Sequence, residues 1–335
     1  MKRKGIVALI FFGICGAFVT GAFWFFQQRG QSSEQSSKLK EVTIQLKWEH
    51  QAQFAGIYVA KEKGLYEEQG LSVTIERGGP GAPPLPQVLS NKAEFGVAGA
   101  DDVLVAVSEG KAIKAIAVIY QESPVAYFAL KESGIKTPYD FVSKRVGVRE
   151  GTGTYFTYIA MLNNLGIDRS KIIEVPAITT EISLLLEKKV DVLPGFRINE
   201  PKIANRMGYA VNIIKPEEYG VDIYADVLVT TQDIIYQKPE LTRAFVKATL
   251  AGWEWAVQNR EEAVDIVMKY ASGTTREHQR DMLEETAELI KRSPTVKIGQ
   301  MNFSKWNRTY SLLRQYDVIK NDFDIEQAYT TDFLK

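Results

Sequence analysis

The sequence is poor in the residues that build disulfides and metal centres. It has one cysteine, Cys15, and two histidines, His50 and His278. A single cysteine excludes an intramolecular disulfide framework and any zinc or iron–sulfur site built from cysteine. Two histidines leave little room for a histidine-rich metal centre. What remains is a binding protein, or an enzyme that uses neither metal nor thiol, and no cofactor is expected.

The chain also lacks an excess of either charge. Forty-one basic residues balance forty-one acidic ones, so the formal net charge is zero. Without a basic excess there is no electrostatic footprint for a phosphate backbone, and nucleic acid is not an expected partner. A hydrophobic fraction of 45% with 24% charged residues is ordinary for a globular chain, and 335 residues are enough for two domains.

The N-terminal residues have the composition of a membrane-inserting segment. Positive charges at residues 2–4 precede an uncharged stretch over residues 5–26, which as a helix would span about 33 Å. An uncleaved anchor fits this length best. A cleaved signal peptide with a weak site at residues 20–22 stays open, as does lipidation at Cys15, although Ile14 does not suit the lipoprotein pattern. All three interpretations export the chain.

A polar segment over residues 27–40 follows, rich in serine and glutamine. Such a composition is typical of a flexible tether between a membrane and a folded domain. We therefore expect an extracytoplasmic protein, tethered or secreted, that contacts the membrane only through its N-terminal segment and folds from about residue 41.

The folded part predicts an α/β architecture. From residue 41 short apolar runs alternate with segments of helical length, a pattern typical of parallel sheets covered by helices. Residues 89–96 resemble residues 186–193 by residue type, and a helix, a glycine and a strand follow each. We interpret this repeat as two similar lobes in tandem, with a cleft between them.

Two apolar segments, residues 125–130 and 225–230, separate the repeated blocks. As extended crossovers they would act as a hinge, because a few residues can absorb the rotation of rigid lobes. The predicted first lobe comprises residues 41–128 and 226–335, and the predicted second lobe comprises residues 129–225.

Several motifs resemble the NMT1/THI5-like family. They are LKW at residues 46–48, QFAGIYVAKEKGLYEEQGL at 53–71, EFGVAG at 94–99, TPYDF leading into KRVGV at 137–148, and VDVLPG leading into NEP at 190–201. The family is related to formylaminopyrimidine-binding and alkanesulfonate-binding proteins, and the resemblance covers roughly residues 41–290. It implies a periplasmic-binding-protein fold of type II, with two lobes, two crossover strands and a ligand cleft.

The resemblance also implies a function. Members of this kind are solute-binding components of ABC importers, so the expected partners are a small-molecule ligand and a transporter permease, and a monomer is expected. A thiamine pyrimidine precursor such as formylaminopyrimidine is the first choice of ligand, with riboflavin-like compounds and sulfonates left open. A sensory ligand-binding module is an alternative.

An enzyme is the other alternative. Pyrimidine synthases resembling this family carry a cysteine-rich CCCFC motif and consume their own histidine. This sequence has no cysteine after Cys15, but His50 lies in a loop near the place where the family's pyrimidine-contacting residues cluster. We expect a protein that is not an enzyme.

The candidate ligand-binding residues follow the predicted strands, where ligands bind in α/β sheets. Trp48 offers a flat face to a heteroaromatic ring, or caps the sheet as a core residue. Tyr58 has an equal claim to the core, and Asp101 could bind a ligand or favour a helix N-terminus. The other candidates in these loops are His50, Gln53, Ala98 and Asn199.

Two further candidates carry more specific chemistry. In the run Gly151, Thr152, Gly153, Thr154 and Tyr155, two glycines allow backbone N–H groups close to a ligand, although a plain strand-to-helix turn would look alike. By the resemblance, Glu200 is the acid that pairs with an aminopyrimidine. It could equally start a helix with Pro201 in the first turn.

Overall fold

A computed structural model describes residues 39–79, 81–177, 181–291, 293 and 295–334. The predicted membrane segment over residues 1–26, Cys15 and nearly all of the predicted tether over residues 27–40 lie outside these residues. Within the described part of the chain, no helix is both long and apolar enough to cross a membrane.

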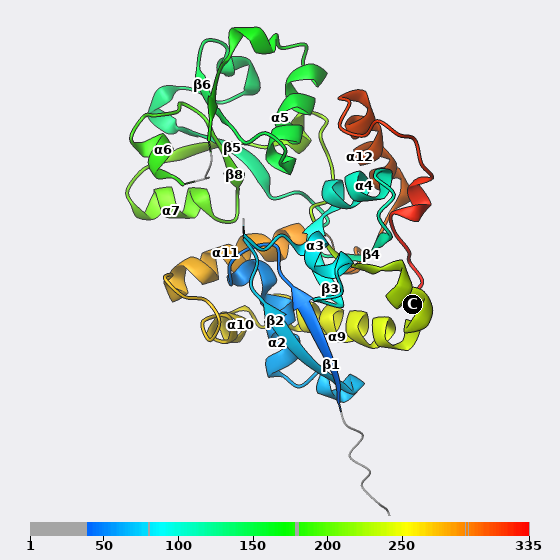
Figure 1. Ribbon diagram of the computed structural model, residues 1–335. Coiled ribbons are helices and arrows are strands. Elements are labelled where there is room, and N and C mark those ends of the chain that lie inside the picture. The colour runs from blue at the N-terminus through cyan, green and yellow to red at the C-terminus, as the bar shows by residue number, and fades with distance from the viewer. Residues whose placement is uncertain (1–38, 80, 178–180, 292, 294, 335) are drawn as a thin grey trace, which may run out of the picture. The chain divides into compact units, whose positions relative to one another are not determined.

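The first lobe is built on a five-stranded sheet in the order β2-β1-β3-β10-β4 (Figure 1). β1 pairs in parallel with β2 and β3, while β10 runs antiparallel between β3 and β4. Every residue of β3 and β10 is buried, as expected for strands covered on both faces. The strands are β1 (Lys40–Gln45), β2 (Leu71–Glu76), β3 (Phe95–Gly99), β4 (Ile113–Val118) and β10 (Asp226–Thr231).

The second lobe repeats this order. β5 runs antiparallel between β8 and β9, β6 pairs in parallel with β7, and a parallel bridge from Val146 to Val192 places β6 beside the start of β8. The resulting order, β7-β6-β8-β5-β9, matches that of the first lobe, with one antiparallel strand at the same position. The strands are β5 (Val125–Leu130), β6 (Arg145–Val148), β7 (Ile173–Pro176), β8 (Leu193–Phe196) and β9 (Val211–Ile214).

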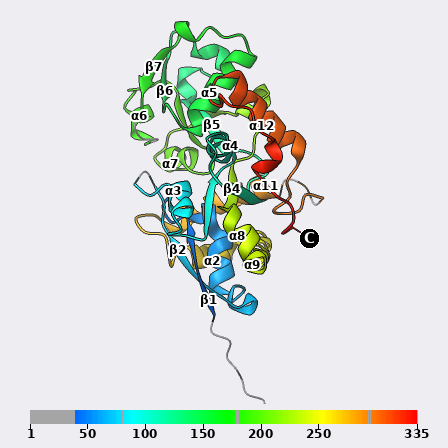
Figure 2. The same cartoon turned by 45° about the vertical axis from the view of Figure 1, so that its right-hand side comes forward.

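Helices cover both sheets. In the first lobe they are α2 (Ala55–Glu62), α3 (Pro84–Leu89), α4 (Ala100–Ser108), α8 (Gln232–Gln237), α9 (Pro239–Gln258), α10 (Arg260–Val267) and α11 (Arg276–Ile290). In the second lobe they are α5 (Gly153–Asn164), α6 (Ser183–Leu186) and α7 (Glu200–Arg206). The last helix, α12 (Phe303–Gln315), lies beside α4 (Figure 2).

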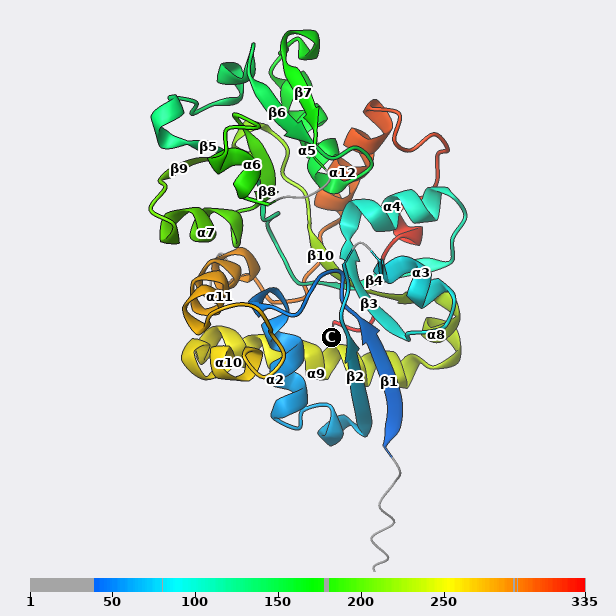
Figure 3. The same cartoon turned by 60° about the vertical axis from the view of Figure 1, so that its left-hand side comes forward.

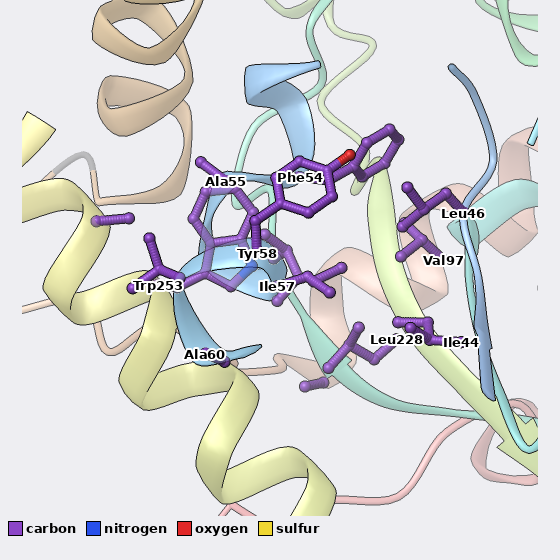
Figure 4. Close-up of a cluster of buried hydrophobic side chains, with 14 of the residues drawn as sticks. Ile44, Leu46, Phe54, Ala55, Ile57, Tyr58, Ala60, Val97, Leu228 and Trp253 are labelled. Carbon is purple, nitrogen blue, oxygen red and sulfur yellow. The ribbon is translucent and has the colours of Figure 1, made fainter. Parts of the chain in front are cut away.

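The main core of the first lobe lies between its sheet and the helix pair α2 and α9. Trp253, Phe54 and Tyr58 are buried in this core (Figure 4). The two helices meet at glycines: a Cβ at Gly56 would lie 2.2 Å from the Trp253 ring, and one at Gly252 would lie 2.2 Å from the Gly56 carbonyl oxygen. Only residues without a side chain permit this approach.

The helical pattern of residues 54–69 predicts one helix that ends at Gly70, but the structure interrupts it. α2 ends at Glu62, and a separate 3₁₀ turn covers Glu67–Gln69. Gly64 has φ +73° and Gly70 has φ +74°, left-handed conformations that end helices. The left-handed conformation of Gly64 therefore ends the helix at Glu62, earlier than the sequence pattern predicts.

The chain passes between the lobes twice. The segments expected as crossovers form β5 in the second sheet and β10 in the first, and residues 119–124 and 221–225 connect the sheets. Two connections were predicted and two are present, but each lies directly before the apolar segment that was expected to form it. The residues at which one lobe ends and the other begins stay a prediction.

Candidate ligand-binding cavity

A cavity of about 820 Å³ is lined by residues of both lobes and both connections. The first lobe contributes the loops after β1 and β3, and the second lobe contributes the N-terminus of α5 and the loop from β8 to α7. Each of these loops follows the carboxyl end of a strand. This is the position at which α/β folds bind ligands. The cavity has the size of a small-molecule site.

Nine of the thirteen predicted site residues line this cavity: Trp48, Gln53, Asp101, Gly151, Thr152, Gly153, Thr154, Asn199 and Glu200. Three of them (Trp48, Gln53 and Asp101) follow β1 or β3 of the first lobe, and the other six belong to the second lobe. Trp48 also packs against the core of the first lobe, so both interpretations of this residue describe part of its surroundings. Ligand contact itself stays a prediction for all of them.

Four predicted residues do not line the cavity. His50 and Tyr58 form a hydrogen bond of 3.0 Å between Nδ1 and the hydroxyl oxygen, and the Tyr58 ring stacks on Tyr270 with 4.4 Å between centroids. Ala98 is fully buried within β3. Tyr155 of α5 packs partly buried against a hydrophobic core, and its hydroxyl accepts a 2.7 Å hydrogen bond from Arg169. The chain positions were near the site, but the side chains point elsewhere.

Other lining residues were not among the sequence candidates. The largest are Lys47, Arg149, Phe196 and Tyr224, and Ser123 comes from the first connection. Lys47 and Phe196 lie within two of the predicted loops, residues 47–53 and 195–200, and Arg149 directly precedes a third, residues 150–155. The loops were therefore predicted, but these residues were not chosen as candidates. Nothing local in the sequence marks Ser123 or Tyr224 as cavity residues.

A buried polar network lies beside the cavity at the end of β1. The Asp226 side chain is only 2% exposed and pairs with Lys47 Nζ at 3.1 Å. It also accepts a 2.7 Å hydrogen bond from Gln53 Nε2. Burial of Lys47 opposes its charge, but the carboxylates of Asp226, Asp102 and Asp101 outweigh this effect, and the pKa of Lys47 is raised. Lys47 therefore stays protonated, and its charge is paired with Asp226.

Asp101 connects the two lobes across the cavity. It lies in the first turn of α4, and a Cβ at Gly153, the first residue of α5, would lie 2.5 Å from its Oδ2. Burial and the neighbouring Asp102 carboxylate raise the pKa of Asp101 to about 7, partly offset by Lys47. Asp102 serves instead as a helix cap, accepting a 3.2 Å hydrogen bond from the Gly99 backbone N–H.

Glu200 starts a helix and also lines the cavity, so its position fits both of the predicted roles. It is the first residue of α7 and lines the cavity, yet it is 4% exposed. Its Oε2 accepts a 2.7 Å hydrogen bond from the Phe196 backbone N–H. The carboxylate packs so closely over Gly195 that a Cβ there would lie 2.7 Å from its carboxyl carbon. The backbone holds the acid in place, while pairing with a ligand stays a prediction.

Polar contacts between α7 and α11 border the cavity, and Figure 3 shows the two helices facing each other. Asn199, a cavity residue, hydrogen-bonds His278 of α11 at 2.8 Å, and Lys202 pairs with Glu285 of α11 at 3.4 Å. Because α7 belongs to the second lobe and α11 to the first, these contacts hold the lobes together. Among the described residues, no group of three or more His, Cys, Asp and Glu side chains could hold a metal ion.

Comparison with known families identifies the chain. The model of the family described as NMT1/THI5 like matches residues 51–263, well over half of the sequence. The chain belongs to the NMT1/THI5-like family. The resemblance carried by the motifs at residues 46–71 and 190–201 is thereby confirmed.

Three proteins that are similar to this member of the NMT1/THI5-like family carry different names. A riboflavin-binding protein, RibY, of Chloroflexus aurantiacus is 26% identical, over 88% of this chain and 86% of its own. A formylaminopyrimidine-binding protein of Halalkalibacterium halodurans is 23% identical, over 88% and 90%. A protein of Legionella pneumophila, also 23% identical over 89% and 94%, is named 4-amino-5-hydroxymethyl-2-methylpyrimidine phosphate synthase.

Solved structures agree on the fold. The periplasmic aliphatic sulphonate-binding protein SsuA of Escherichia coli superposes with a TM-score of 0.71 at 15% sequence identity, covering 86% of this chain and 96% of its own. This member of the NMT1/THI5-like family therefore has the periplasmic-binding-protein fold, as the sequence motifs implied.

Proposed function

We propose that this protein is the extracytoplasmic solute-binding component of an ABC importer and captures a flat nitrogen heteroaromatic metabolite. The observation that carries the proposal is the cavity of about 820 Å³ between the lobes, in which Trp48 and Phe196 accompany buried hydrogen-bonding groups. Aromatic side chains stack on planar rings, while a few fixed polar groups select their edges. The binding proteins among its relatives support the same role.

The size of the cavity bears on the ligand. Drug-sized ligands occupy cavities of about 300–1,000 Å³, and a tricyclic flavin with its side chain is of that size. A single pyrimidine ring would fill only a small part of 820 Å³. Riboflavin, which one relative is named for binding, is therefore the first candidate. A thiamine pyrimidine precursor such as formylaminopyrimidine, which another relative is named for, is the second.

Closure of the lobes would report ligand binding to the permease. A ligand shifts an open–closed equilibrium only by its difference in affinity for the two states. Contacts from both lobes to one molecule supply that difference, because Trp48 lies in the first lobe and Phe196 in the second. Residues 1–26 would tether or export the protein, so that the cavity faces the outside of the cell membrane, with the monomer as the working unit.

Two features argue against the synthase alternative suggested by one relative. The sequence has no cysteine after Cys15, so no thiol can serve at the cavity. His50 hydrogen-bonds Tyr58 and does not line the cavity, so it is not presented as a reactant. Formation of a pyrimidine product from the purified protein with pyridoxal phosphate and iron would reverse this conclusion.

A ligand screen tests the proposal. We expect riboflavin to raise the melting temperature of the protein by linkage, and formylaminopyrimidine, hydroxymethylpyrimidine, thiamine and taurine complete the panel. Replacing Trp48 with alanine should weaken binding of the stabilising ligand by about 10- to 100-fold, since stacking of a heteroaromatic ring on an aromatic side chain contributes about 1–3 kcal/mol.

The matched control is Trp255→Ala. Trp255 is a half-buried tryptophan of α9 that packs against Lys63 and does not line the cavity. We expect this variant to bind like the wild type. Equal affinities of all three proteins for the stabilising ligand would place its site outside the cavity, and no stabilisation by any heteroaromatic compound would reject the proposed ligand class.

A further inference from the structure

The cavity wall carries more acids than bases. Asp101, Asp102, Glu181 and Glu200 line it, against Lys47 and Arg149. The positive charge of Lys47 is largely balanced by the buried Asp226, 3.1 Å away. The charges that a ligand meets are therefore mainly negative, which disfavours anions.

One place in the cavity would be expected to attract an anion. The N-terminus of α5 points into it, and helix N-termini carry a partial positive charge and unpaired N–H groups. The capping residue Thr152 makes no side-chain cap hydrogen bond. Its hydroxyl instead donates a 2.6 Å hydrogen bond to the Arg149 carbonyl oxygen and contacts the Thr154 hydroxyl at 2.8 Å.

Asp101 already occupies this place. A Cβ at Gly153 would lie 2.5 Å from Asp101 Oδ2, and a Cβ at Gly99 would lie 2.4 Å from Oδ1. The carboxylate is thus wedged between the end of β3 and the first residue of α5, with a glycine on either side. Both glycines make room for it, since any side chain at either position would displace it.

We propose that Asp101 is a charge filter: a built-in anion at the N-terminus of α5 that excludes anionic ligands from the cavity. The charge filter rests on the proposed function, because it assumes that the cavity is the ligand site. The filter narrows the ligand class to neutral or cationic heteroaromatic compounds. Phosphate esters, sulfonates and carboxylates of the same size are rejected, because their charge would compete with Asp101 for the same helix end.

Riboflavin and its 5′-phosphate, FMN, test the filter because they share one ring system and differ by one phosphate. At pH 8 we expect the wild-type protein to bind riboflavin at least about 30-fold more tightly than FMN. In Asp101→Asn, which keeps the shape of the side chain and removes its charge, FMN affinity should rise at least tenfold while riboflavin affinity changes less than threefold. Fluorescence titration measures both.

Asp233→Asn is the matched control. Asp233 is an exposed residue of α8 that does not line the cavity, so its removal changes the net charge equally without touching the filter. We expect its FMN affinity to equal that of the wild type. If the control gains as much as Asp101→Asn, or if Asp101→Asn gains nothing, the filter is refuted. Should Asp101→Asn fail to fold, Asp101→Ser replaces it.

A second probe separates the filter from the identity of the ligand. Sodium sulfate, compared with sodium chloride at equal ionic strength, should raise the melting temperature of Asp101→Asn by several degrees more than that of the wild type or Asp233→Asn. If neither flavin binds, the flavin assignment fails and this sulfate comparison alone decides the filter. Equal sulfate responses in all three proteins would overturn it.

Discussion

Replacing Arg197 with methionine is expected to lower the free energy of unfolding by about 3–5 kcal/mol, the cost of leaving buried charges unpaired. The Arg197 side chain is only 7% exposed and lies just after β8. It contacts Glu217 at 2.5 Å, Glu122 at 3.1 Å and Glu285 at 3.5 Å. Without the guanidinium these three carboxylates would repel one another where water screens them poorly.

The position of this cluster makes the effect large. Glu217 belongs to the second lobe, Glu122 to the first connection and Glu285 to α11 of the first lobe. Arg197 therefore joins three segments that lie far apart in the sequence and belong to different parts of the fold. Methionine keeps much of the volume of the arginine stem, so the loss should come from charge rather than from a cavity.

Urea unfolding at pH 7 measures this effect. The matched control is Arg243→Met on α9, where the arginine side chain is 45% exposed and lies 4.0 Å from Glu240; exposed ion pairs contribute about 0–1 kcal/mol. A loss below about 1 kcal/mol in Arg197→Met, similar to the control, would show that the cluster contributes nothing to the stability of the fold.

Replacing Asp101 with asparagine is expected to stabilise the protein at pH 8 and to leave its stability unchanged near pH 4. Burial and Asp102 raise the pKa of Asp101 from 3.8 to about 7, with Lys47 opposing. A pKa shift of one unit corresponds to about 1.36 kcal/mol. Keeping this carboxylate ionised in the folded protein therefore costs up to about 4 kcal/mol of stability. Asparagine does not carry that cost.

The sign follows from proton binding. Between about pH 4 and pH 7 the folded protein holds a proton on Asp101 that the unfolded chain has released, so the contribution of this residue to stability falls as pH rises. Above pH 7 the full cost is present. The groups that face Asp101 are Asp102 on its own helix, Lys47 after β1 with its partner Asp226, and the N-terminus of α5.

Melting temperatures from pH 4 to pH 9 check this prediction. We expect the wild-type and Asp101→Asn curves to meet near pH 4 and to separate up to about pH 8, with Asp233→Asn following the wild type. Parallel curves for the wild type and Asp101→Asn would mean that ionising Asp101 costs the folded protein no stability. A gain in stability together with the loss of anion exclusion is the trade-off expected for a residue kept for binding.

Much of the fold could be predicted from the sequence because its signals are local. Alternating apolar runs and helical segments predict two lobes. The resemblance between residues 89–96 and 186–193 matches two lobes whose strands follow the same order, once the bridge from Val146 to Val192 is included. The helix through residue 69 was wrong because Gly64 can end a helix without any break in the apolar pattern.

The candidate site was predictable to the extent that it consists of loops after strands. Trp48 and residues 151–154 reach the cavity since the strand before each loop fixes its position. Partners far apart in sequence could not be predicted: Lys47 meets Asp226 across 179 positions, and Asp101 meets Gly153 from the other lobe. His50 shows the same limit, because its hydrogen bond to Tyr58 turns it away from the cavity.

The crystal structure of the protein with riboflavin tests the central claim most directly, namely that the cavity between the lobes holds a flat heteroaromatic ring. We predict the ring within van der Waals contact of Trp48 from the first lobe and of at least one cavity residue from the second lobe. A flavin bound outside the residues that line the cavity, or a closed protein whose cavity stays without the flavin at saturating concentration, would contradict the account.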